Sequence, residues 1–559
     1  MISTHTNPSD IWGEQFSDDE RALLAPFVTD LDSSIFGLRN LPEVVKGALF
    51  SRYSRSDKSL RRILLDEFIQ APEAGFAAIA GRAEGVDHVD QLVAIRQAEA
   101  FYERVLIGYG DDSVAELGGA HVACEGISNI AAKALEDARI GISPLEKSTR
   151  YVVFNRKVAG QYRYLREAAI MASAHADAYQ QAMDGLFDCY SAMLNPAIAF
   201  IRAGSPREAG TSERAYTSAT RAKAYDLLRG LLPMATLTNV GLFGNGRAFE
   251  YLLTRLYAAP LAELQQLGTA LQQPLDAMIP SFVKRAKSER GHEQQAYLRA
   301  TRQQVDAAAQ RIIATAQQQP TPAMTEQQHS GVELIDYDHD AELRVIAAIL
   351  YAQSNLSLAE TRHIAESLPD TERQALIDVY VGERQSRFQR PGRAFEEARY
   401  CFDLLADIGA YRDLQRHRVL TQERQRFGIQ HGYSIPAEIE AVGLAETYRQ
   451  ALEHAAEVSS QIAIDLPDEA QYAVPMAFRV RWRITLNLRE LYHLVELRSA
   501  PQGHPSYRRI AQTMYALVRE IHPMLTKGMR FVDLGDYQLE RLDAERRLDQ
   551  KLKRLGHLE

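Results

Sequence analysis

The feature that most constrains the fold of this chain is an internal repeat. Each half holds the same succession of a Pro-Met-Ala segment and an Asn-x-Arg segment, with an identical separation from the proline to the arginine: Leu232-Pro233-Met234-Ala235 with Asn245-Gly246-Arg247, and Val474-Pro475-Met476-Ala477 with Asn487-Leu488-Arg489. Such self-similarity is explained economically by duplication of one unit. With 559 residues, the chain is also too long for one ordinary core, so two domains are expected.

Changes in composition along the chain suggest where the domains begin and end. Residues from about 287 onward become rich in Gln, Ala and charge, which predicts a polar helix and then a linker. The C-terminal tail is heavily charged, so we expect a helix there that is solvated or packed on another subunit. The predicted plan has five parts: a polar extension over 1–35, a first repeat over 36–286, the Gln-rich helix and linker over 287–330, a second repeat over 331–534 and a charged C-terminal helix over 535–559.

Bulk composition is that of a globular protein that folds in water. Hydrophobic residues make up 46% and charged residues 25%, and we find no apolar run of membrane length or secretory signal, so a cytoplasmic protein is expected. A net charge of -9 argues against a nucleic-acid partner. Cys124, Cys189 and Cys401 lack metal or redox spacing, so buried reduced thiols and no metal site are expected.

Two stretches near the middle of the second half carry local signals. Residues 399–405 are compatible with a strand or with the start of a helix, and periodicity does not decide between them. Residues 478–484 alternate basic and apolar side chains, which predicts a strand.

The densest basic run follows an apolar segment and contains Arg416, His417 and Arg418. Consecutive side chains leave a helix end in different directions, and arginine forks suit bidentate contacts with phosphate. One interpretation is therefore a clasp for a phosphate or pyrophosphate. The alternative is a solvated basic helix end, which the helix dipole also favours.

This run carries a resemblance to a known family. Arg416-His417-Arg418 followed by Gln425-Arg426-Phe427 resembles the signature of the flavin-dependent thymidylate synthases (the ThyX family), in which Arg-His-Arg precedes Glu-x-Ser-x-Arg-Tyr. Residues 145–152 resemble a second copy of this signature, and a Ser-Val-x-Glu element at 113–116 precedes them. Both copies depart from the pattern: Leu117 replaces a histidine in the first, and Gln422 and Arg424 replace the glutamate and serine in the second.

The resemblance implies a fold and a set of site residues. The implied fold is α+β, with two tandem ThyX-like repeats that each have a small, mainly antiparallel sheet flanked by many helices. The implied catalytic residue, expected to face the pyrimidine, is Arg498. The implied cofactor-binding residues are Arg416, His417, Arg418, Asn487, Arg489 and His493. The implied substrate-binding residues are Glu146, Ser148, Arg150 and Arg426.

The resemblance also implies an activity. In the family, NADPH reduces FAD, and methylenetetrahydrofolate supplies the carbon that converts dUMP into thymidylate. Because the two half-signatures are complementary, we expect composite sites between unlike repeats, and a homodimer that gives a four-repeat assembly. Two alternatives stay open: a divergent flavin- or nucleotide-binding protein with another uridylate-modifying activity, and a non-catalytic helical scaffold.

Overall fold

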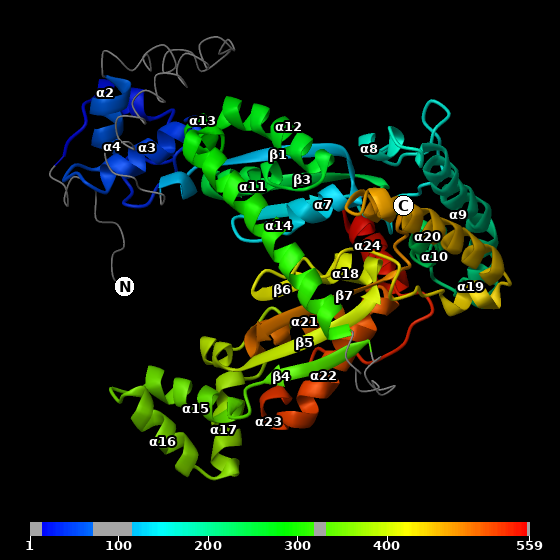
Figure 1. Ribbon diagram of the computed structural model, residues 1–559. Coiled ribbons are helices and arrows are strands. Elements are labelled where there is room, and N and C mark those ends of the chain that lie inside the picture. The colour runs from blue at the N-terminus through cyan, green and yellow to red at the C-terminus, as the bar shows by residue number, and fades with distance from the viewer. Residues whose placement is uncertain (1–13, 71–113, 318–330, 556–559) are drawn as a thin grey trace. The chain divides into compact units, whose positions relative to one another are not determined.

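The computed structural model describes residues 14–70, 114–317 and 331–555 (Figure 1). The chain forms two compact units, which do not coincide with the predicted repeats. Unit 1 comprises Met1–Glu125, Ala138–Glu146 and Asn239–Gln319, and unit 2 comprises Gly126–Asp137, Lys147–Thr238 and Pro320–Glu559. A large part of the first half therefore packs with the second half. Among the described helices, none has the length and apolarity needed to cross a bilayer.

Unit 1 is built on a three-stranded sheet with the order β1-β3-β2. The strands are β1 (Gly119–Ser128), β2 (Ile142–Glu146) and β3 (Leu237–Asn245), and the last residues of β1 and the first of β3 belong to unit 2. Strands β2 and β3 are antiparallel. The helices before the sheet are α2 (Asp18–Leu24), α3 (Glu43–Tyr53), α4 (Leu60–Ile63), the π-helix η1 (Leu64–Ile69) and η2 (Val114–Glu116). Those after it are α11 (Gly246–Tyr257), α12 (Ala262–Met278), α13 (Pro280–Val283), η4 (Lys284–Lys287) and α14 (Glu289–Gln317).

Unit 2 contains a four-stranded antiparallel sheet with the order β4-β5-β7-β6. Its strands are β4 (Val332–Tyr337), β5 (Arg399–Asp407), β6 (Leu420–Arg424) and β7 (Arg479–Asn487). Residues 399–405 are thus a strand, and the alternation predicted for 478–484 is confirmed, since Val480, Trp482 and Ile484 are buried. Apolar side chains of one face form the core under this sheet.

The helices of unit 2 come from both halves of the sequence (Figure 1). From the first half come α7 (Asn129–Glu136), α8 (Ala168–Met171), α9 (Ala176–Gly204), α10 (Glu213–Leu228) and η3 (Arg229–Leu231). From the second half come α15 (Ala341–Ala352), α16 (Leu358–Ser367), α17 (Asp370–Val381), η6 (Arg393–Glu397), α18 (Ile408–Leu414), α19 (Ala437–Ala441), α20 (Ala445–Asp465), η7 (Glu469–Ala473), α21 (Leu488–Arg498), α22 (Pro505–Ile521), α23 (Pro523–Thr526) and α24 (Leu542–Arg554).

The repeated Pro-Met-Ala segments pair with each other inside unit 2. The backbone N–H of Met234 donates to the carbonyl of Val474 at 2.9 Å, and the N–H of Met476 donates to the carbonyl of Leu232 at 3.0 Å. Helices α9 and α20, which precede the two segments, also pack together (Figure 1). Corresponding parts of the two halves therefore meet in one core, which explains why residues 147–238 leave the unit of their own sheet.

The small antiparallel sheets and many helices confirm the α+β class. Two local expectations need correction. The C-terminal helix α24 packs against α10 of the same chain, because carboxylates of α24 pair with Arg214 of α10. Cys124 and Cys189 are buried free thiols as expected, but Cys401 is partly exposed.

Candidate functional site

Charged side chains from both halves of the sequence surround Asp413, which lies near the end of α18 in unit 2. The nearest is Arg229, whose Nη1 lies 3.1 Å from Asp413 Oδ2. Burial alone would raise the pKa of the Asp413 carboxyl, but Arg229, Arg416, Arg498 and Arg150 outweigh it and hold that pKa well below its usual range. Asp413 is therefore an ionised carboxylate that pairs with Arg229 and is stabilised electrostatically by Arg416, Arg498 and Arg150.

Arg150, expected from the sequence, is held by a second carboxylate. Its Nε donates to Asp226 Oδ1 at 2.7 Å, its Nη2 donates to Asp226 Oδ2 at 2.5 Å, and its Nη1 donates to the carbonyl of Gln502 at 3.0 Å. Burial would lower the pKa of Arg150, but Asp226 raises it further than burial lowers it. The guanidinium is thus permanently charged and fixed in direction.

The two other members of the first signature have different positions. Ser148 lies in the turn before Arg150, where its hydroxyl accepts a hydrogen bond from the Arg150 backbone N–H at 3.3 Å. Its observed role is to stabilise that turn. Glu146 is buried at the end of β2 and belongs to unit 1.

His417 is the buried centre of the basic run. It is only 4% exposed, whereas Arg416 and Arg418 on either side are exposed. Its Nε2 lies 3.0 Å from Arg498 Nε, which donates, and its Nδ1 lies 2.8 Å from Glu490 Oε1. Since Nε2 must accept, the proton is on Nδ1 and the ring is neutral. Burial, with Arg498 and Arg390, accordingly holds the pKa of His417 well below its usual value.

Beside this ring lies His493, predicted to bind a cofactor. The ring centroids of His417 and His493 are 5.4 Å apart. Together with Glu490 they offer three ligand-type atoms that lie within 4.8 Å of one another. A guanidinium faces each imidazole, however: that of Arg498 on His417, and that of Arg390 at 3.2 Å from His493 Nδ1. These positive charges oppose a divalent cation and favour an anionic ligand.

The remaining predicted residues flank this centre or lie outside it. Arg416 Nε is 3.5 Å from Glu136 Oε1 of α7, while Arg489 donates from Nε to the carbonyl of Pro391 at 2.9 Å. Asn487 is the N-cap of α21, where its side-chain oxygen accepts from the Glu490 N–H at 2.9 Å. In the same way Asn245 caps α11 in the first half. The repeated asparagine thus has a structural role in both halves.

Arg426, also predicted to bind substrate, forms an ion pair with Asp468. Its Nη1 lies 3.2 Å from Asp468 Oδ1, and its side chain is 51% exposed. Such an exposed pair contributes little to stability.

Arg229, Asp226 and Asp413 are functional candidates that sequence reasoning missed. The available signal was an acid and a base three residues apart, Asp226 and Arg229, in the otherwise apolar run at the end of α10. Residues at that spacing share a helix face. Charges on an apolar face require partners, but the sequence did not show that the partners would be Arg150 and Asp413.

A cavity of about 630 Å³ lies beside Arg229, with walls from α10, the end of β5, α22 and the C-terminal segment. Arg229 Nη2 is buried, has no hydrogen-bond partner among the described residues, and lies 3.8 Å from Asp407 Oδ1, which also lines the cavity. Burial and Arg229 lower the pKa of His504, another wall residue, to about 4, which keeps that imidazole neutral. The cavity therefore offers a fixed cation, a neutral imidazole and the rings of Tyr448 and Tyr537.

The chain belongs to the thymidylate synthase complementing protein family. The family model matches residues 70–281 and 333–524, which places one copy in each half of the chain and confirms the tandem arrangement.

Comparison with individual proteins gives whole-length relatives. The chain is 43% identical to a UPF0159 protein of Chlamydia pneumoniae, over 96% of this chain and 98% of that one. It is 34% identical to a UPF0159 protein of Thermoplasma acidophilum, over 90% and 99%. Among solved structures, the UMP/dUMP methylase PolB from Streptomyces cacaoi, bound with 5-Br dUMP, matches with a TM-score of 0.30 and 19% identity, over 35% of this chain and 93% of that one.

Proposed function

We propose that this chain methylates a uridine nucleotide, dUMP or a close analogue, at C5 in the manner of a flavin-dependent thymidylate synthase. Family membership supports the class of reaction. FAD would supply the hydride, NADPH would reduce the flavin, and methylenetetrahydrofolate would supply the carbon.

The observation that carries the proposal is that residues of both half-signatures lie in one compact unit. Arg150 comes from the first half, whereas Arg416, His417 and Arg498 come from the second, and all four lie in unit 2. Three of them, Arg150, Arg416 and Arg498, act on the same carboxylate, Asp413. This arrangement supports a composite site in which each half supplies what the other has lost.

Arg498 and Arg229 are the residues we assign to the pyrimidine. Adding a nucleophile or hydride to a uracil ring places negative charge on its carbonyl oxygens. A preoriented cation in a site that excludes water stabilises such charge by several kcal/mol, on the order of 3. Arg498 is fixed by His417 Nε2 and lies with its Cζ 5.7 Å from the Tyr507 ring centroid. Arg229 would direct its Nη2, which has no hydrogen-bond partner among the described residues and lies 3.8 Å from Asp407 Oδ1, to a substrate acceptor.

The donor set around His417 fits the pyrophosphate of a flavin dinucleotide. Arg416 and Arg418 are exposed on either side of the buried ring, and guanidinium forks match phosphate oxygens. We assign Arg416, Arg418 and Arg489 to the binding of the pyrophosphate. The uncharged imidazoles of His417 and His493 would lie beside these arginines and help to position them. We also propose that two chains form a homodimer with four repeats.

A second candidate is the alkylation of a pyrimidine with little or no phosphate charge. It is favoured by Asp226 and Asp413, which already neutralise Arg150 and Arg229 inside the site. A substrate phosphate would have to compete with these carboxylates. Comparing dUMP with deoxyuridine as acceptor distinguishes this candidate from the first.

The test uses the purified full chain. We expect a yellow protein with a visible flavin absorption band, and oxidation of NADPH that depends on added dUMP and methylenetetrahydrofolate. Arg150→Met and Arg416→Met should each abolish this oxidation, and Arg426→Met should retain most of it. A colourless protein that binds neither flavin nor uridylate would leave only the scaffold alternative. Loss of activity in only one of the two critical variants would refute the composite site.

A further inference from the structure

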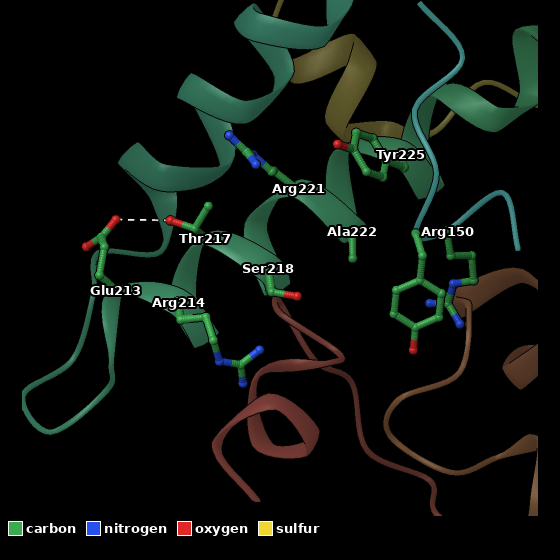
Figure 2. Close-up of a pocket in the computed structure, with 9 residues that line it drawn as sticks. Arg150, Glu213, Arg214, Thr217, Ser218, Arg221, Ala222 and Tyr225 are labelled. Atoms are coloured by element: carbon green, nitrogen blue, oxygen red, sulfur yellow. Dashed lines mark hydrogen bonds between the residues drawn. The ribbon is translucent and has the colours of Figure 1, made fainter. Parts of the chain in front are cut away.

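A second pocket lies on the face of α10 beside the arginine cluster (Figure 2). Its volume is about 500 Å³, and three arginines but only one acid line it: Arg150, Arg214 and Arg221 against Glu213. The guanidinium of Arg150 is already held by Asp226, so the cationic character available to a ligand comes from Arg214 and Arg221.

The pocket also offers groups suited to the uncharged part of a ligand. Thr217 and Ser218 lie between the two arginines on α10; the Thr217 hydroxyl donates to Glu213 Oε1 at 3.0 Å and accepts from Arg202 Nη2 at 3.1 Å. Tyr151 is 61% exposed at the pocket wall with Arg541 Cζ 4.1 Å from its ring centroid, and Tyr225 adds a second ring. Phosphate oxygens bind guanidinium and hydroxyl groups, and aromatic rings stack on bases. The lining thus has the chemistry that recognises a nucleotide.

The C-terminal helix supplies carboxylates to Arg214, one of the residues that line this pocket. Arg214 Nη1 lies 3.1 Å from Glu545 Oε2, and its Nε contacts Asp549, which also accepts from the Ser212 hydroxyl. In Figure 2, Arg214 and Ser218 point toward the C-terminal segment. Helix α24 follows the last residue matched by the family model, residue 524. The carboxylates therefore come from a segment outside the family-matched region.

These contacts join a partly exposed guanidinium to buried carboxylates. The Arg214 side chain is 37% exposed, whereas those of Glu545 and Asp549 are 11% and 9% exposed, so a ligand reaches these ion pairs from the arginine side. A second attachment of α24, Arg546 to Glu208 at 2.6 Å, lies outside the pocket lining and has an acid that is 69% exposed. Two sets of charge pairs thus attach α24, and only the set on Arg214 involves a residue that lines the pocket.

We propose that the α10 pocket is a second nucleotide site, and that Glu545 and Asp549 of α24 occupy Arg214 until a nucleotide phosphate displaces them. The phosphate binds Arg214 and Arg221, the hydroxyls of Thr217 and Ser218 complete its contacts, and Tyr151 receives the base. Binding then frees α24 from α10. Arg150 belongs both to the lining of this pocket and to the Asp413 cluster, but the phosphate contacts proposed here are Arg214 and Arg221, so the proposal does not rest on the proposed methylation.

The test uses the full chain and makes two measurements: hydrogen exchange of residues 542–554, and ligand binding by calorimetry. ADP is the probe, and adenosine is the control ligand without phosphate charge. ADP is not a uridylate, so the outcome is independent of the methylation assay. We expect saturating ADP to raise exchange in 542–554 about tenfold and adenosine to leave it unchanged, the effect of losing about 1.4 kcal/mol of attachment.

Three variants separate charge competition from simple loosening. The double variant Glu545→Gln/Asp549→Gln should bind ADP about tenfold more tightly, and Arg221→Gln about tenfold more weakly. Glu208→Gln, which weakens α24 without touching the pocket, should bind ADP within about twofold of the original chain. The proposal is refuted if ADP leaves exchange in 542–554 unchanged, or if the double variant binds ADP no more tightly. The proposal is also refuted if Glu208→Gln increases the ADP affinity as much as the double variant does. In that case α24 would block the pocket sterically, and its carboxylates would not compete with the phosphate.

Discussion

The buried pair of Arg150 and Asp226 allows a quantitative prediction. The two side chains are only 8% and 3% exposed, and the carboxylate is bound by both Nε and Nη2 of the guanidinium. Asp226→Leu leaves a buried arginine without its partner. Removing one member of such a pair costs about 3–5 kcal/mol, whereas replacing both members by apolar groups costs far less. We therefore expect Asp226→Leu to destabilise unit 2 by that amount, and Arg150→Met/Asp226→Leu to recover most of it.

The assay must report on one part of a chain with two compact units, since global unfolding is not expected to be two-state. Native-state hydrogen exchange of the α10 amides, Glu213–Leu228, gives the local unfolding free energy. The matched control is Asp468→Leu, which breaks the exposed pair with Arg426 and should cost less than about 1 kcal/mol.

The same pair sets a pH dependence. Burial raises the pKa of Asp226, but Arg150 outweighs burial and the folded-state pKa is lowered. The unfolded chain therefore binds more protons below about pH 4, the ordinary range of an aspartate. The stabilisation is fully present above that pH and is lost as pH falls through the lowered folded pKa. A cost of Asp226→Leu below about 1 kcal/mol at neutral pH, or a double variant as unstable as the single one, would refute the reasoning.

Three further predictions concern the site and the thiols. Nitrogen NMR should find His417 neutral with its proton on Nδ1 at pH 6, and its lowered pKa should make stability fall as pH drops below about 6.5; a charged ring at pH 6 would contradict the geometry. Arg498→Lys, which cannot reproduce the Nε contact, should lower kcat about a hundredfold with little change in KM, measured as dUMP-dependent NADPH oxidation. Burial raises the pKa of Cys124 and Cys189 to about 11, so a disulfide reagent at pH 8 should modify both only after unfolding, and rapid native labelling would contradict their burial.

Much of the local structure was predictable because it depends on neighbouring residues. The alternation through Trp482 indicates a strand at any position in a sheet. The repeated asparagines at 245 and 487 cap helices, because each side-chain oxygen accepts the backbone N–H of the residue three positions later. The basic run at 416–418 could also be recognised, since three adjacent cationic or titratable side chains are a local feature. The repeated Pro-Met-Ala and Asn-x-Arg motif also indicated which segment of the first half corresponds to which segment of the second.

The sequence by itself therefore determined the duplication, the α+β class and the main donors of the candidate site. Only the tertiary structure decided that residues 147–238 leave their own sheet for unit 2, that Asp226 and Asp413 hold the arginines, and that His417 is neutral. The physical reason is distance along the chain: Arg150 meets Asp226, and His417 meets Glu490, across more than seventy residues. No local period encodes such pairs, and only the tertiary packing of their elements brings them together.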